Sequence, residues 1–138
     1  MEKNIFCRRA NYYETDKMGI VHHSNHIRYF EEARILFMRN IGCDVAELEQ
    51  LGVIIPNVDA YAKYEKPIRF NDEVFIEVML TKFNGAVMEY HYTAKFADGS
   101  IAATGHTTHC FVTDNFKPIS LKRKFPTYYS RLKENLCE

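Results

Sequence analysis

The fold is decided by residues 12–39, which read YYETDKMGIVHHSNHIRYFEEARILFMR. A polar turn with Asp16 and Gly19 comes first, followed by a short apolar and histidine segment. A helix is then predicted to open near Ser24 or Asn25, because both side chains accept hydrogen bonds from the free N–H groups of a first helical turn. Those N–H groups and the positive end of the helix dipole can hold an oxyanion, and the carboxylate just ahead of them can act as a nucleophile or a base.

The predicted helix runs from about residue 26 to residue 41 and is expected to be buried on most sides. Its apolar residues recur at helical spacing: Ile27, Phe30, Ala33, Leu36, Phe37, Met38 and Ile41. A stripe as wide as this is typical of a helix that packs into a protein core. The charged residues of the remaining face stand three or four positions apart and are predicted to pair with one another: Arg28, Glu31, Glu32 and Arg34.

The second half of the chain predicts antiparallel strands joined by hairpins. Three runs are separated by Asn84-Gly85 and Asp98-Gly99, pairs that favour tight hairpin turns. Shorter elements surround these runs: a first strand over 5–12, a short helix over 44–51, an irregular or edge strand over 53–64 and a terminal helix over 126–136. Hairpin-linked strands argue against a doubly wound parallel sheet and favour an α+β fold, an antiparallel sheet wrapped on one dominant helix.

Alternation within the first two runs predicts which strand residues share one face of the sheet. The first two runs each place their apolar residues on one face: Val74, Ile76, Val78 and Leu80, then Met88, Tyr90, Tyr92, Ala94 and Phe96. The third run covers 101–113 and is rich in small residues. Gly105 within it indicates a bend or a close approach of the backbone.

Length and composition predict a single domain over residues 1–138. Lys plus Arg and Asp plus Glu number 18 each, so no net charge attracts nucleic acid. Neither a signal peptide nor an apolar run long enough to span a bilayer is found. The cysteines have no paired spacing, which indicates reduced thiols in a cytoplasmic protein: Cys7, Cys43, Cys110 and Cys137.

Asp16 and the histidines near it are the candidate reactive residues. An Asp in a Gly-containing loop is more often a turn former than a catalyst, but a position ahead of a helix start favours a chemical role. His22, His23 and His26 could instead bind a metal with Asp16, although their spacing is not that of a metalloprotease helix. A histidine that contacts the substrate or holds Asp16 in place is the preferred interpretation. The other histidines lie on predicted strands and are assigned no role: His91, His106 and His109.

The same stretch resembles the hotdog-fold acyl-CoA thioesterases, specifically the branch of the 4-hydroxybenzoyl-CoA thioesterases and the Tol–Pal-associated YbgC-like enzymes. The resemblance rests on the order and spacing of the following residues: Tyr12, Glu14, Thr15, Asp16, Gly19, Val21, His23, Asn25 and Phe30-Glu31-Glu32-Ala33-Arg34. It extends over nearly the whole chain, through Lys66-Pro67, the three strand runs and Lys117-Pro118-Ile119. His22 and His26 depart from the pattern, since aromatic residues are common there in relatives.

The resemblance implies a hotdog fold, in which an antiparallel sheet wraps around one long central helix. It also implies homodimers that join their sheets edge to edge and often pair again into homotetramers. Sites in this family lie at subunit interfaces, so one chain would not hold a complete site.

The implied activity is hydrolysis of an acyl-CoA thioester to a free acid and coenzyme A, with neither metal nor cofactor. Asp16 falls on the family's catalytic carboxylate, a nucleophile or general base, while His23 falls on its motif histidine and Tyr12 on its active-site tyrosine. The N–H at or beside His23 falls where the family polarises the thioester carbonyl. Four nearby residues are expected to contact the substrate: Gly19, Val21, His22 and Asn25. An acyl-carrier-protein substrate and a non-catalytic acyl-CoA binding protein are the alternatives.

Overall fold

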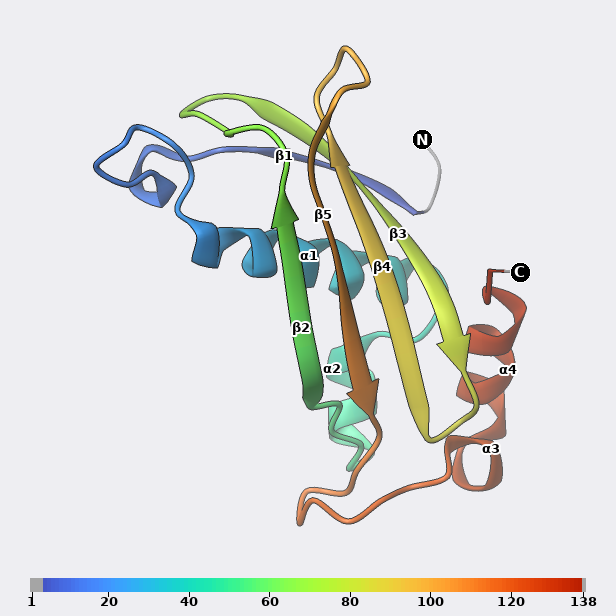
Figure 1. Cartoon of the computed structure of the whole chain (residues 1–138). Helices are drawn as coiled ribbons and strands as arrows, with labels where there is room; N and C mark the ends of the chain where they lie inside the picture. Colours follow the sequence, from blue (N-terminus) through green and yellow to red (C-terminus); the bar gives the residue numbers. More distant parts are fainter. Residues whose placement is uncertain (1–3, 138) are drawn as a thin grey trace.

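A five-stranded antiparallel sheet curves around the long helix α1 (His23–Asn40) in the computed structural model, which describes residues 4–137 (Figure 1). The strand order is β1-β3-β4-β5-β2, so the hairpin-linked strands occupy the middle of the sheet. The strands are β1 (Ile5–Arg9), β2 (Asn57–Tyr64), β3 (Glu73–Phe83), β4 (Val87–Lys95) and β5 (Ile101–Cys110). This architecture confirms the predicted α+β hotdog fold. The predicted domain boundaries include residues 1–3 and 138, which lie outside the described residues.

Four shorter helical segments complete the chain: η1 (Tyr12–Glu14), α2 (Val45–Gln50), α3 (Leu121–Lys124) and α4 (Pro126–Glu134). The helix predicted over 44–51 is confirmed as α2, and its N-cap Asp44 accepts a hydrogen bond from the Ala46 N–H at 3.3 Å. The predicted terminal helix is confirmed as α4, while α3 was not predicted. Within residues 4–137, every helix is too short or too polar to cross a bilayer.

The core lies between α1 and the sheet face that α1 covers. Alternate residues of β3 and β4 are buried there, as predicted: Val74, Ile76, Val78, Leu80, Met88, Tyr90, Tyr92 and Ala94. The ring of Phe30 stacks on that of Tyr92 with centroids 4.6 Å apart. Phe37 meets Tyr90 edge to face at 6.0 Å. These ring pairs hold α1 across β4 in one orientation, because each has a preferred geometry as well as buried area.

Gly105 on β5 lets α1 approach the sheet closely. A β-carbon built on this residue would lie 2.5 Å from Cε2 of Phe30 and would also clash with the carbonyl oxygen of Tyr61 on β2. Any larger residue would push α1 or β2 away. The close backbone approach predicted for this position is therefore confirmed.

Three predicted strand boundaries are wrong, two of them for a local reason. β1 ends at Arg9 rather than at 12, because Asn11 opens the tight turn of η1. β2 begins at Asn57 rather than at 53, because a proline precedes it; its place at the sheet edge is as predicted. β5 ends at Cys110 rather than at 113.

The start of α1 also differs from the prediction. His22, with extended backbone angles (φ −62°, ψ 140°), is the N-cap, and its ring Nδ1 accepts a hydrogen bond from the Ser24 N–H at 3.2 Å. Ser24 and Asn25, which were predicted to open the helix, lie inside its first turn. An imidazole nitrogen thus takes the role that short oxygen-bearing side chains usually have at an N-cap.

The predicted pairing of charges along α1 is mostly wrong. Arg34 lies 3.7 Å from Glu31 but is itself buried, and it donates to the Tyr92 hydroxyl at 3.2 Å. Glu32 pairs with Arg8 of β1 at 2.7 Å instead of with a helix neighbour. Arg34 and Glu32 therefore find partners on the sheet, which helical spacing cannot reveal.

Candidate active site

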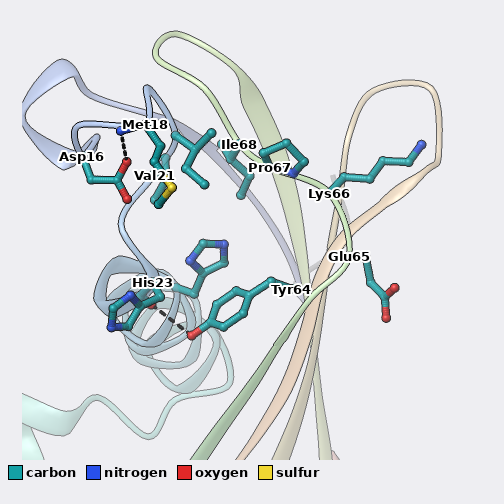
Figure 2. Close-up of a pocket in the computed structure, with 11 residues that line it drawn as sticks. Asp16, Met18, Val21, His23, Tyr64, Glu65, Lys66, Pro67 and Ile68 are labelled. Atoms are coloured by element: carbon teal, nitrogen blue, oxygen red, sulfur yellow. Dashed lines mark hydrogen bonds between the residues drawn. The ribbon is translucent and has the colours of Figure 1, made fainter.

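A cavity of about 390 Å³ opens beside the first turn of α1 (Figure 2). One wall comes from the loop before α1 and from α1 itself: Asp16, Met18, Ile20, Val21, His23 and His26. The other wall is the end of β2 and the segment after it: Tyr64, Glu65, Lys66, Pro67 and Ile68. Apolar side chains make up much of this lining, which suits an apolar ligand with a few polar groups to orient it.

Asp16 is held in a tight turn at the cavity wall. Its backbone N–H donates to the Ile20 carbonyl at 2.8 Å, and its own carbonyl accepts from the Gly19 N–H at 2.9 Å. Gly19 has a positive φ of 79°, which glycine adopts at no steric cost. The Oδ1 atom accepts a hydrogen bond from the Met18 N–H at 2.9 Å. In the described part of the chain no donor meets Oδ2, so that oxygen is available to a ligand or a water molecule.

Beside the cavity, the backbone N–H groups in the first turn of α1 are only partly paired within residues 4–137. The His22 N–H donates to the Glu14 carbonyl at 2.9 Å, and the Asn25 N–H donates to the His22 carbonyl at 2.9 Å. The Ser24 N–H is taken by the His22 ring. Among residues 4–137 no acceptor meets the N–H of His23, which lines the cavity. This N–H, at the positive end of the helix dipole, is suited to hold an oxyanion.

The remaining predicted site residues lie outside the cavity lining. Tyr12 is 75% exposed and packs edge to face on Phe70, with centroids 5.5 Å apart. The side chain of Asn25 is buried and donates to the Glu14 carbonyl at 2.9 Å. His22 caps the helix, and Gly19 shapes the turn. Within one chain, the structure therefore brings together Asp16, Val21 and His23 but not these four.

His26, considered from the sequence as a metal ligand beside Asp16, and Tyr64, which was not predicted, also line the cavity. Their rings meet edge to face at 4.7 Å, and the Tyr64 hydroxyl donates to the His23 carbonyl at 3.4 Å. Burial lowers the pKa of His26 below its ordinary 6.5, so the ring is neutral at neutral pH. Tyr64 could have been suspected from sequence only because it ends a strand just before the Lys66-Pro67 pair.

Glu14 is a second carboxylate that sequence reasoning left without a role. It is buried and forms a double ion pair with Arg8 at 2.9 and 2.6 Å. Burial alone raises the pKa of Glu14, but hydrogen bonds from Arg8, the Asn11 N–H and Tyr29 outweigh it and hold that pKa below the ordinary 4.5. The spacing of Asn11 and Glu14 is that of a capping box, a signal that could have indicated it.

The three histidines considered as metal ligands do not share one set of neighbours. The rings of His22 and His23 lie 4.0 Å apart, whereas the His26 ring packs on Tyr64. Over residues 4–137, no three His, Cys, Asp or Glu side chains are grouped so as to hold a metal ion.

Known proteins resemble this chain in sequence and in structure. Residues 11–125 match the family model described as the Thioesterase-like superfamily. An Aquifex aeolicus (strain VF5) protein whose name proposes an esterase is 35% identical over 120 residues, 87% of this chain and 92% of that protein. YneP of Bacillus subtilis (strain 168), whose name proposes an acyl-CoA thioesterase, is 29% identical over 122 residues, 88% of each chain. A solved DHNA-CoA thioesterase from Staphylococcus aureus superposes with a TM-score of 0.91 and 32% identity, over 95% of this chain and 89% of that one.

Proposed function

Because the chain belongs to the thioesterase-like superfamily, we propose that it is a single-domain enzyme that hydrolyses an acyl-CoA thioester to a free carboxylic acid and coenzyme A. One observation carries this proposal: the Asp16 carboxylate and the residue with the free helix N–H, His23, line the same cavity. The names of relatives, a DHNA-CoA thioesterase among them, support a coenzyme A thioester as the substrate.

In the proposed mechanism, the N–H of His23 polarises the thioester carbonyl. The carbonyl oxygen gains negative charge as the tetrahedral state forms, and a single donor aimed at such an oxygen is typically worth ~3 kcal/mol. The dipole of α1 adds to this stabilisation. The ring of His23 stands at the same wall, where it positions the thioester or Asp16.

Asp16 has two possible roles in this scheme. Its free Oδ2 attacks the carbonyl carbon and expels the thiolate, giving a mixed anhydride that water then cleaves to the acid and Asp16. Alternatively, Oδ2 takes a proton from a water molecule, which attacks in its place. The Met18 N–H on Oδ1 orients the carboxylate in either case. A thiolate leaves with little acid assistance, so neither scheme needs a further general acid.

We also propose that the enzyme works as a homodimer joined through β2, with pairing of dimers into a tetramer as a further step. In the sheet of residues 4–137, β2 has a strand neighbour on one side only, and nearly all of its residues are exposed. An unprotected edge of this length is a template for pairing with a second chain. Tyr64 ends β2 and lines the cavity, so a partner's β2 would run close to the site.

The deciding experiment measures thiol release from short-chain, long-chain and aromatic acyl-CoA esters by the wild type and by Asp16→Asn. The expected result is a loss of most turnover with the fold intact. Asp44→Asn is the matched control, because Asp44 also accepts a hydrogen bond from the N–H two residues later, at 3.3 Å, but at the start of α2 and outside the cavity lining.

The outcomes separate the candidate functions. Release that collapses only in Asp16→Asn supports a carboxylate-dependent thioesterase, and the best ester identifies the acyl class. Near-normal release by Asp16→Asn rejects the role of Asp16. Binding of acyl-CoA without release by the wild type favours a non-catalytic binding protein, unless an acyl-carrier-protein thioester is turned over.

A further inference from the structure

Glu14 precedes Asp16 by two residues, but its carboxylate is hydrogen-bonded to other protein groups and lies outside the cavity lining. The residue is 4% exposed and does not line the cavity. Its two oxygens accept four hydrogen bonds: from Arg8 Nη1 at 2.9 Å, Arg8 Nη2 at 2.6 Å, the Tyr29 hydroxyl at 2.7 Å and the Asn11 N–H at 2.8 Å. Three of these bonds end on Oε1 and one on Oε2, so both oxygens are bound by protein groups. Glu14 therefore acts on the protein rather than on a ligand.

This carboxylate joins three elements of the fold. Arg8 comes from β1, Glu14 from η1 and Tyr29 from α1. The Arg8 guanidinium also lies over the Tyr29 ring, 4.5 Å from its centroid, and donates to Glu32 Oε1 at 2.7 Å. Hydrogen bonds between charged partners are the stronger kind and fix geometry when they are doubled, as here.

The backbone of Glu14 is hydrogen-bonded to residues beside the cavity. Its carbonyl accepts two hydrogen bonds from the start of α1, from the His22 N–H and from Asn25 Nδ2, both at 2.9 Å. Asp16 follows after a single residue, and its N–H bonds to the Ile20 carbonyl at 2.8 Å. The peptide of Glu14 thus lies between the turn that holds Asp16 and the helix end that presents the His23 N–H.

We propose that Glu14 is a positioning residue, which sets the placement of the Asp16 carboxylate relative to the free N–H of His23. The inference rests on the proposed function, in which these two groups meet the thioester together. Misplacement of a reacting group by about 1 Å can cost roughly a hundredfold in rate. The tightly held Glu14 side chain is the feature that prevents such a shift.

The test compares Glu14→Gln with the matched control Glu32→Gln, using acyl-CoA thiol release. Both variants remove a carboxylate that binds Arg8, but only Glu14 is attached to the Asp16 turn. Glu14→Gln should lower kcat by roughly tenfold or more and change KM by less than about threefold. Glu32→Gln should stay within about twofold of the wild-type kcat. Equal losses in the two variants would overturn the proposal.

A double-mutant cycle separates positioning from a general loss of structure. In an Asp16→Asn background, measured at high enzyme concentration, Glu14→Gln should change the residual kcat by less than about twofold, because its effect passes through Asp16. A general structural defect would reduce kcat by the same factor in both backgrounds, and that result would also overturn the proposal.

The possible failures are distinguishable. Near-normal turnover by Asp16→Asn would overturn both the proposed function and the positioning role. An inactive Asp16→Asn together with a Glu14→Gln variant of wild-type kcat would overturn the positioning role alone. If Glu14→Gln does not fold, Tyr29→Phe replaces it, since that variant removes one hydrogen bond to Glu14 and keeps the Arg8 pair. Its kcat should fall severalfold, and an unchanged kcat would overturn the proposal.

Discussion

Gly105 on β5 faces the ring of Phe30 on α1 with no room for a β-carbon between them. We predict that Gly105→Ala destabilises the protein by about 1–3 kcal/mol, the usual cost of an extra carbon forced into a packed core. Urea unfolding measures this change. Thr104→Ala is the control, because Thr104 points to the opposite sheet face, and it should stay within about 0.5 kcal/mol of the wild type. An equally stable Gly105→Ala variant would contradict the close approach.

The fold could be predicted because its main signals are local. The alternation in β3 and β4 and the wide apolar stripe of α1 each lie within one continuous segment. Gly105 was recognised for the same reason, as a glycine inside a strand pattern. Strand ends were less accurate, because they depend on single residues such as Asn11, whose backbone turns before the apolar pattern stops.

The lining of the candidate site could be predicted only where its residues are neighbours in sequence. Asp16 and His23 belong to one motif, and both line the cavity. Tyr64 and Ile68, at the end of β2 and in the segment after it, line the opposite wall of the cavity. No local sequence pattern indicates this contact. The pairing of Glu14 with Arg8 was missed because it depends on how η1 folds back against β1.

The histidine that caps α1 provides a second prediction. His22→Ala should cost about 1 kcal/mol of stability, because the Ser24 N–H loses its acceptor at Nδ1. His22→Asn should restore most of this loss, since its side-chain oxygen can accept the same hydrogen bond. Urea unfolding and KM for the best acyl-CoA ester should be measured together. A stable His22→Asn variant with a strongly raised KM would instead support the substrate contact expected from the sequence.

We predict that the protein loses stability in acid because His109 is buried. Burial, together with the nearby charge of Arg34, lowers its pKa from the ordinary 6.5 to about 3, and its Nε2 lies 2.8 Å from Thr107 Oγ1. The folded protein therefore keeps His109 neutral while the unfolded chain takes up a proton below pH 6.5. Stability should fall as the pH drops from about 6.5 towards 3, by up to ~1.4 kcal/mol per pH unit from this group.

The variant His109→Gln tests this origin of the acid sensitivity. Its free energy of unfolding should fall less steeply with decreasing pH than that of the wild type, with His26 contributing a remaining part in the same direction. Thr107→Val is the control, because it removes the hydrogen-bond partner and keeps the buried imidazole. That variant should be less stable at every pH with an unchanged slope. Identical slopes for His109→Gln and the wild type would show that His109 is not the cause.

The exposed edge of β2 provides the last prediction, which concerns the proposed dimer. Ala60 is exposed near the middle of β2, where a lysine on each of two paired strands would place two positive charges close together. Lysine at a strand edge also opposes edge-to-edge pairing. We expect Ala60→Lys to raise the dimer dissociation constant at least tenfold, measured by sedimentation. Thiol release should fall in parallel at enzyme concentrations where the variant is monomeric, because the site would lack its partner strand.

Ala97→Lys is the control, because it makes the same exchange in the exposed β4–β5 turn and should remain dimeric and active. Monomeric Ala60→Lys with full turnover would mean that one chain holds a complete site, whereas a monomeric wild type would remove the dimer from the proposed function.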